Sequence, residues 1–135
     1  MAGDATDYSE TVWEHFRTPR NAGAFPAGTE GVIEGRAGSR RQGREIAFAM
    51  RLDGAGKVLE CRYRVYGCPA TVALCSVLSE RLKGRTVPEL GEPRGLALAE
   101  ELELPPAKRA AALLLEDALA AALARYNMTS RRQTA

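Results

Sequence analysis

The fold is decided by the stretch REIAFAMRLDGAGKVLECRYRVY, residues 44–66. On either side of DGAG, large apolar residues occupy every second position. These positions are Ile46, Phe48, Met50 and Leu52 before it, and Leu59, Cys61, Tyr63 and Val65 after it. A period of two predicts strands with one buried and one solvated face. DGAG, residues 53–56, predicts the hairpin turn that joins them.

The pattern changes on both sides of this hairpin. Upstream, Val32 and Ile33 lie in a short candidate strand, which would complete an antiparallel meander of about three strands. Downstream, YGCPA at residues 66–70 leads into an apolar stretch from Ala70 to Lys83 that stops at Gly84. Its spacing predicts a largely buried helix with a glycine stop.

The remaining segments predict further helices. YSETVWEHF, residues 8–16, has apolar residues at helical spacing, and short helical pieces are expected between residues 87 and 103, broken by Pro93 and Gly95. LPPAK, residues 104–108, opens a long helix from about residue 107 to 126, because proline is tolerated in a first turn. The predicted fold class is α+β, with helices packed on one face of a small antiparallel sheet.

Length and composition set the limits on function. A chain of 135 residues, 45% hydrophobic and 27% charged, predicts a single globular domain over residues 1–135, with a core at about 8–126 and frayed termini. No apolar run is long enough for a membrane span. The net charge of +2 gives no reason to expect nucleic acid or membrane as a partner. The polar N-terminus does not resemble a signal peptide, so we expect a cytoplasmic protein.

Three cysteines, Cys61, Cys68 and Cys75, and one histidine, His15, make up the candidate ligands. Their odd number argues against a disulfide framework, and their spacing argues against a structural zinc site. We expect Cys61 and Cys75 in the core and His15 at the surface or in an interface. No triad, phosphate loop or paired acid and base is present, so the sequence does not predict an enzyme.

Five strings occur in one order along the chain. They are YSETVWEHFRTPRNAGAF (8–25), YGCPA (66–70), LKG (82–84), LPPAK (104–108) and LEDALAAALARY (115–126). Together they resemble the U-type iron–sulfur cluster assembly scaffolds, the IscU-like family that includes the N-terminal domain of NifU. The resemblance implies the same α+β fold. It also implies a site of three cysteines and one aspartate for a [2Fe–2S] cluster, with a cysteine desulfurase as the sulfur donor.

Position by position, this chain departs from that site. Cys68 matches the middle cysteine of the family, and Gly43 matches a glycine. Gln42 falls where the first cysteine stands, Arg44 replaces the aspartate and Ala111 replaces the third cysteine. Because a guanidinium is always protonated and repels iron, we expect no cluster held by the usual ligands. Any [2Fe–2S] cluster or iron would be weakly bound or shared with a partner.

Three functions therefore stay open. The first is a scaffold-like or accessory protein of iron–sulfur cluster assembly, and the second is a persulfide carrier that uses Cys68 alone. The third is a non-catalytic interaction module on the scaffold fold. At the start of a helix, Cys68 is expected to be activated as a thiolate, with Arg44 acting in the same direction, or else to be a packed thiol.

Two basic or proline-rich segments are candidate partner sites. Leu104, Pro105, Pro106, Ala107 and Lys108 match the string that Hsp70-type chaperones recognise in the family, although paired prolines also have a structural reason to open a helix. Arg40, Arg41 and Arg44 form either a solvated basic loop or an attraction for an acidic partner.

Overall fold

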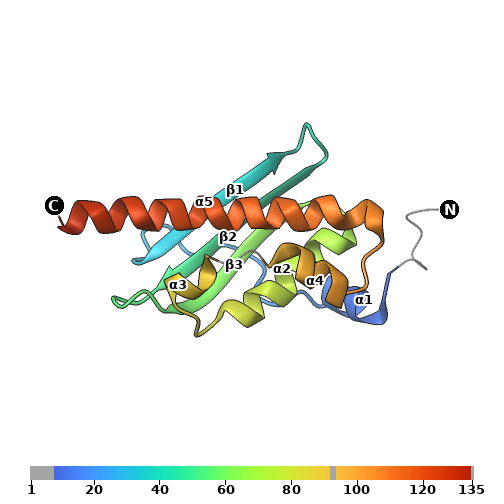
Figure 1. The fold of residues 1–135 in the computed structure, drawn as a ribbon, viewed down its shortest axis with the longest axis horizontal. Coiled ribbons are helices and arrows are strands. Elements are labelled where there is room, and N and C mark those ends of the chain that lie inside the picture. The colour runs from blue at the N-terminus through green and yellow to red at the C-terminus, as the bar shows by residue number, and fades with distance from the viewer. Residues whose placement is uncertain (1–7, 92–93, 135) are drawn as a thin grey trace.

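The computed structural model describes residues 8–91 and 94–134. Three strands form one antiparallel sheet in the order β1–β2–β3: β1 (Val32–Ser39), β2 (Arg44–Leu52) and β3 (Val58–Tyr66). The helices are α1 (Glu10–Arg17), α2 (Pro69–Leu82), α3 (Val87–Leu90), α4 (Gly95–Glu101), the 3-10 turn η2 (Pro106–Lys108) and α5 (Arg109–Thr134). This arrangement confirms the α+β class, with helices on one face of a three-stranded sheet (Figure 1).

Both hairpin turns follow from local chemistry. Between β2 and β3, the Oδ1 atom of Asp53 accepts hydrogen bonds from the backbone N–H groups of Ala55 and Lys57, each at 2.9 Å. The predicted turn at residues 53–56 is therefore confirmed. Between β1 and β2, residues 40–43 make the turn, with Gly43 at a φ of 84°. β1 runs for eight residues, longer than the short strand expected around Val32 and Ile33.

The helical layer is built around α5 and α2. α5 packs along β1 and β2, and α2 packs on β3 (Figure 1). Close approach of α5 depends on Gly35, because a β-carbon there would overlap the carbonyl oxygen of Ala118 and the backbone nitrogen of Ala122. Leu115, Ala118 and Ala122 are buried in this contact.

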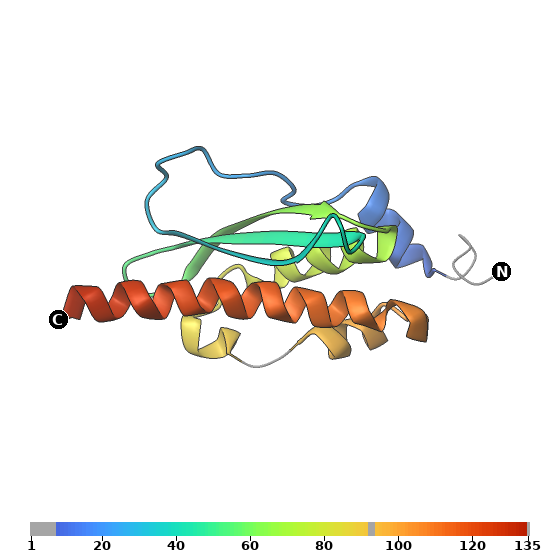
Figure 2. The same ribbon diagram turned by 90° about the horizontal axis from the view of Figure 1, so that it is seen from above.

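The outer face of the sheet is covered as well, which corrects the expectation of a solvated face. Ala47 and Ala49 of β2 are buried, like the larger residues that alternate with them. The segment between α1 and β1 crosses this face, on the side opposite α2 and α5 (Figure 2). Gly23 donates a hydrogen bond to the Tyr63 carbonyl at 2.9 Å, and Arg62 lies over the Phe25 ring. The residue pattern of a strand does not predict a contact that a loop distant in sequence makes with it.

His15 also differs from expectation. Although it was predicted at a surface or in an interface, it is buried between α1 and α2, with its Nδ1 atom 2.7 Å from the hydroxyl of Ser76. The same Ser76 oxygen accepts the backbone N–H of Arg20. A polar side chain at this position therefore joins α1 and the following loop to α2.

Some element ends differ from the sequence-based expectation. α2 ends at Leu82, next to Gly84, as predicted, whereas α5 starts at Arg109 and continues to Thr134 rather than ending near Tyr126. α3 and α4 confirm the short pieces before it. The expected break at Pro93 and the expected frayed residues 1–7 lie outside the described residues. Within the described ranges, no helix is both long and apolar enough to cross a bilayer.

Candidate functional site

The candidate site lies at one end of the molecule. The turn between β1 and β2, the start of α2 and the start of α5 all point toward the same end in two perpendicular views (Figures 1 and 2). The chain reaches this end three times: β2 starts there, β3 ends there and leads into α2, and α5 starts there before it runs along the sheet. Sequence segments far apart are thereby brought into one region.

Cys68 is the N-cap residue of α2. Its backbone is extended, and its carbonyl accepts the first helical hydrogen bonds, from Thr71 at 3.0 Å and Val72 at 3.2 Å. The Sγ atom lies 3.4 Å from the hydroxyl oxygen of Thr71. Pro69 at the first helical position needs no hydrogen-bond partner for its nitrogen, which suits the helix start. The thiol is partly buried and packs against the edge of the core.

The surroundings of Cys68 favour its thiolate. Burial alone would raise the pKa of Cys68, but the hydroxyl and N–H of Thr71, the charge of Lys108 and the N–H of Ala70 outweigh it. Together they hold the pKa of Cys68 below its ordinary value. Hydrogen bonds to the ionised form and a nearby cation are the effects expected at a helix N-terminus. The thiol is thus prepared for nucleophilic attack.

Tyr8 and Lys108 complete this cluster from two other elements. Burial and the charge of Cys68 raise the pKa of Tyr8, while the charge of Lys108 and a hydrogen bond to it act in the opposite direction. Lys108 ends the turn η2, where its N–H donates to the Pro105 carbonyl at 2.8 Å. The cation whose charge lowers the pKa of Cys68 is therefore Lys108, a role that we had expected of Arg44.

Arg44 nevertheless lies beside the start of α2. A β-carbon built on Gly67 would be 3.6 Å from Cγ of Arg44 and 3.2 Å from the hydroxyl oxygen of Thr71. The aliphatic stem of Arg44 thus borders the same small space as Thr71, one residue before Cys68. The role of Arg44 as a site residue stays a prediction of the gap-free alignment.

The other two positions of the expected site differ in exposure. Gln42 is exposed in the turn between β1 and β2, where its backbone N–H donates to Ser39. Ala111 is fully buried in the first turn of α5, where it forms part of the core. Neither an exposed amide at a turn nor a buried methyl group supplies a charged donor next to Cys68.

The remaining cysteines are in the core. Cys61 on β3 is buried, and burial raises its pKa to about 12. Cys75 on α2 has no exposed surface, and burial raises its pKa further. All three cysteines are free thiols. Of the three thiols, Cys68 is therefore the one that is partly exposed and whose pKa is lowered.

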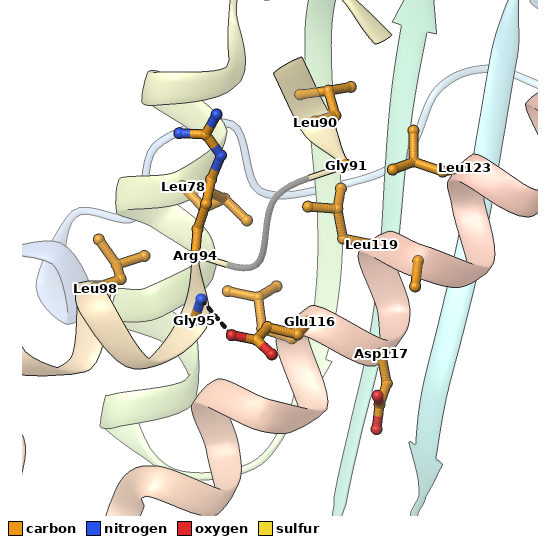
Figure 3. A pocket seen from close by; sticks show the side chains of 12 residues that line it. Leu78, Leu90, Gly91, Arg94, Gly95, Leu98, Glu116, Asp117, Leu119 and Leu123 are labelled. Carbon is orange, nitrogen blue, oxygen red and sulfur yellow. Dashed lines mark hydrogen bonds between the residues drawn. The ribbon is translucent and has the colours of Figure 1, made fainter. Parts of the chain in front are cut away.

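A groove elsewhere on the molecule is unrelated to this cluster. Leucines from four helices line it, Leu78, Leu90, Leu98, Leu115, Leu119 and Leu123 (Figure 3). Within it, the backbone N–H of Gly95 donates to the carboxylate of Glu116 at 2.8 Å, which caps the start of α4 (Figure 3). The groove is a packing gap between helices, and its lining residues include neither Cys68 nor its neighbours.

Comparison with known proteins identifies the family. The family model described as the NifU-like N-terminal domain matches residues 7–133. The chain belongs to the NifU-like N-terminal domain family. It is 36% identical over 119 residues to the iron–sulfur cluster assembly scaffold protein IscU of Escherichia coli (strain K12), covering 88% of this chain and 93% of that protein. It is 33% identical over 128 residues to the iron–sulfur cluster assembly enzyme IscU of Drosophila melanogaster, with 95% and 83% covered.

Solved structures share the fold of this NifU-like domain. A putative scaffold protein for the SUF system from Fervidobacterium islandicum AW-1 gives a TM-score of 0.67 at 16% identity, covering 90% of this chain and 99% of that one. The N-terminal part of a NifU-like protein from Brucella abortus gives 0.66 at 20% identity, with 90% and 95% covered. At these identities the likeness concerns the fold alone.

The residues of this NifU-like domain do not fit an iron–sulfur cluster as a cargo held by this chain alone. Among the described residues, no group of three or more His, Cys, Asp and Glu side chains could hold a metal ion. In the described part of the chain, the charged residues placed near Cys68 are the cations Lys108 and Arg44. Iron and its clusters prefer thiolate ligands, and one thiolate beside cations does not provide a ligand set.

Sequence reasoning missed Tyr8 and Thr71, and assigned Lys108 to partner binding only. The spacing of Cys68 and Thr71 could have revealed their contact, because a residue at the third helical position reaches back toward the N-cap. Tyr8 and Lys108 carry no such local signal. Their approach to Cys68 depends on how α1 and α5 pack against α2.

Proposed function

We propose that this chain is an iron–sulfur cluster assembly scaffold-like or accessory protein that accepts sulfur at Cys68 and does not hold a cluster on its own residues. The observation that carries the proposal is the difference between the three thiols. Cys68 is partly exposed, with its pKa below the ordinary value, whereas Cys61 and Cys75 are buried with raised pKa values. Family membership supports the pathway, because the relatives are named for cluster assembly.

The proposed chemistry is a thiol–persulfide exchange with a cysteine desulfurase. The Cys68 thiolate attacks the terminal sulfur of the desulfurase persulfide. A new S–S bond forms at Cys68, the S–S bond of the desulfurase persulfide breaks, and the desulfurase cysteine leaves as a thiolate. No electrons are gained or lost overall, so the exchange needs neither an oxidant nor a reductant. The chain is then a stoichiometric carrier rather than an enzyme.

The partners and compartment follow from the same proposal. A cysteine desulfurase is the sulfur donor, and the segment Leu104–Lys108 is a proposed site for an Hsp70-type chaperone. In the fold, Leu104 is buried and the next residues form η2, so a chaperone that needs an extended segment would bind only after it detaches. Three free thiols suit a reducing compartment, and we propose the cytoplasm.

Two measurements distinguish the open functions. After incubation with a cysteine desulfurase and L-cysteine, intact-mass analysis should show a gain of one sulfur atom on the wild type and none on Cys68→Ser. A Cys61→Ala, Cys75→Ala double variant is the matched control and should still take up sulfur. No mass gain on the wild type would refute the carrier and favour the interaction module.

Anaerobic reconstitution tests the cluster. With iron and sulfide supplied, the wild-type chain should retain far less than one cluster per monomer, and its visible absorption should be weak. A stable, stoichiometric cluster on the wild-type monomer would show that the missing ligands at residues 42, 44 and 111 do not matter. It would restore the ordinary scaffold function.

A further inference from the structure

Arg44 is placed on the inner face of the sheet by the register of β2. Side chains alternate along a strand, so Arg44 shares the face of Ile46 and Phe48, which the helices cover. Glu45 shares the opposite face, where Arg40 lies 3.9 Å from its carboxylate. The strand therefore places the Arg44 side chain on the face of the helices and the carboxylate of the next residue, Glu45, on the opposite face.

Arg44 and the Cys68 thiol border the same side chain. The Cγ atom of Arg44 and the hydroxyl oxygen of Thr71 both contact the position of a β-carbon on Gly67, and that hydroxyl is 3.4 Å from the Cys68 sulfur. Gly67 leaves this position open. The stem of the arginine thus lies within one side chain of the thiol.

The side chain of Arg44 has no charged partner in the part of the chain that the structure describes. Among the described residues, Arg44 forms no ion pair and no side-chain hydrogen bond, although its side chain is partly buried. Lys108 adds a second positive charge that acts on Cys68. A guanidinium keeps its charge at every physiological pH. Lys108 and Arg44, the charged residues that the structure describes beside the thiol, are therefore both positive.

We propose that Arg44 decides which ligands the Cys68 site accepts, selecting an anionic sulfur species, the perthiolate of a Cys68 persulfide, over a divalent metal ion. The choice of persulfide rests on the proposed function, whereas the preference for anions is a property of the resting site. An alkyl persulfide is a stronger acid than its parent thiol, so the loaded form carries the negative charge that Arg44 can hold. The same guanidinium repels an approaching iron ion.

Two alkylating reagents measure this preference without a desulfurase. Iodoacetate is an anion and iodoacetamide is neutral, and both attack the same Cys68 thiolate. The rate constant for iodoacetate divided by that for iodoacetamide therefore reports the electrostatic potential at the thiolate, and this ratio is independent of the thiol pKa. In Arg44→Gln the ratio should fall about threefold, the effect of one charge at ~6 Å in water. In wild type it should fall with added salt.

Arg41→Gln is the matched control, because Arg41 lies exposed in the turn before β2, whereas the stem of Arg44 borders Gly67 and Thr71. Its ratio should stay at the wild-type value. Equal ratios in the wild type and in Arg44→Gln would overturn the proposal. Thermal unfolding of both variants checks that the fold is intact.

Cobalt(II) alone tests the exclusion of cations. Arg44→Asp should bind Co²⁺ with thiolate-to-metal absorption at lower metal concentrations than wild type, and equal binding by the two would overturn this half of the proposal. The outcomes separate the two proposals. If the ratio falls in Arg44→Gln but the wild type takes up no sulfur, the proposed function is refuted and the selectivity of Arg44 stands. If the wild type takes up sulfur but the ratio is unchanged in Arg44→Gln, the selectivity is refuted and the proposed function stands.

Discussion

The sulfur of Cys68 lies 3.4 Å from the hydroxyl oxygen of Thr71, three residues further along the same chain. The contact arises because Cys68 caps α2 and Thr71 occupies the third helical position, from which a side chain reaches back over the cap. A thiol that caps a helix in this way receives a hydroxyl and backbone N–H groups from one short segment. Its reactivity therefore depends on local structure that the sequence CPAT encodes.

Thr71→Val should slow the alkylation of Cys68 at neutral pH. The substitution keeps the shape of the side chain but removes the hydroxyl that stabilises the thiolate, so the pKa of Cys68 rises. Loss of a hydrogen bond to a charged group should lower the rate of alkylation by iodoacetamide about tenfold at a pH below the pKa of Cys68. At a pH above the pKa of both proteins the rates should converge. Thr71→Ser is the control, and an equal neutral-pH rate for Thr71→Val would contradict the role of the hydroxyl.

Limited alkylation should label the three cysteines in a fixed order. Cys68 should react first at neutral pH, because its thiolate is favoured and its sulfur is accessible. Cys61, whose pKa is raised to about 12, and the fully buried Cys75 should react only as the protein opens. Peptide mapping by mass spectrometry gives the order. Modification of Cys61 or Cys75 before Cys68 in the folded protein would show that the site has been assigned to the wrong thiol.

His15 should make the protein less stable in mild acid. Burial and the charge of Arg20, with a smaller effect of Arg81, lower the pKa of His15, against the opposing charges of Glu80 and Glu14. The unfolded chain, with an ordinary histidine pKa of about 6.5, therefore binds the proton more readily. Stability from neutral His15 is present above that pH and is lost as the pH falls through it.

Chemical denaturation at a series of pH values between about 7 and 5 measures this loss. The free energy of unfolding of wild type should decrease across the window more than that of His15→Gln, whose side chain does not titrate. Only the slopes are compared, since the substitution also changes the contact with Ser76. Parallel slopes would mean that His15 is protonated equally in the folded and unfolded chains.

Gly35→Ala should destabilise the fold strongly. The added methyl group would overlap the carbonyl oxygen of Ala118, so α5 would have to move away from β1. Overpacking of this kind costs about 1–3 kcal/mol. Gly54→Ala is the control, because a β-carbon at Gly54 meets no atom within 4 Å. Equal unfolding midpoints for the two variants would show that α5 does not depend on this contact.

The sequence was sufficient for the elements with strong local patterns. The alternation in residues 44–66, the turn at Asp53 and the stop at Gly84 each follow from the residues of one segment, and the strands and the turn are found where they were expected. Leu59 is an exception to the alternation: a register shift between Arg51 and Leu52 pairs Leu52 with Val58, so Val58 is buried and Leu59 is only partly buried. The buried outer face at Ala47 could not be predicted, because the loop that covers it comes from before β1. A small residue under a loop and a small residue facing water look the same in sequence.

The site was predictable to a similar extent. The resemblance of its segment to a family motif points to Cys68, and the alignment without gaps from Cys68 points to Arg44. Lys108 and Tyr8 were not connected to the thiol, because their contacts depend on how three separate elements pack. His15 was misplaced for a related reason, since its burial depends on a hydroxyl, Ser76, on another helix.

The covered outer face of β2 has a further consequence for solubility. Ile46 to Met50 are five consecutive apolar residues without charge or proline, the composition of segments that stack into cross-β aggregates when exposed. In the fold they are protected by the helices on one face and by the crossing loop on the other. Glu45 and Arg51 flank the segment as charged gatekeepers. A protease cut or mutation that frees the loop would therefore threaten the protein through aggregation before it affected the thiol.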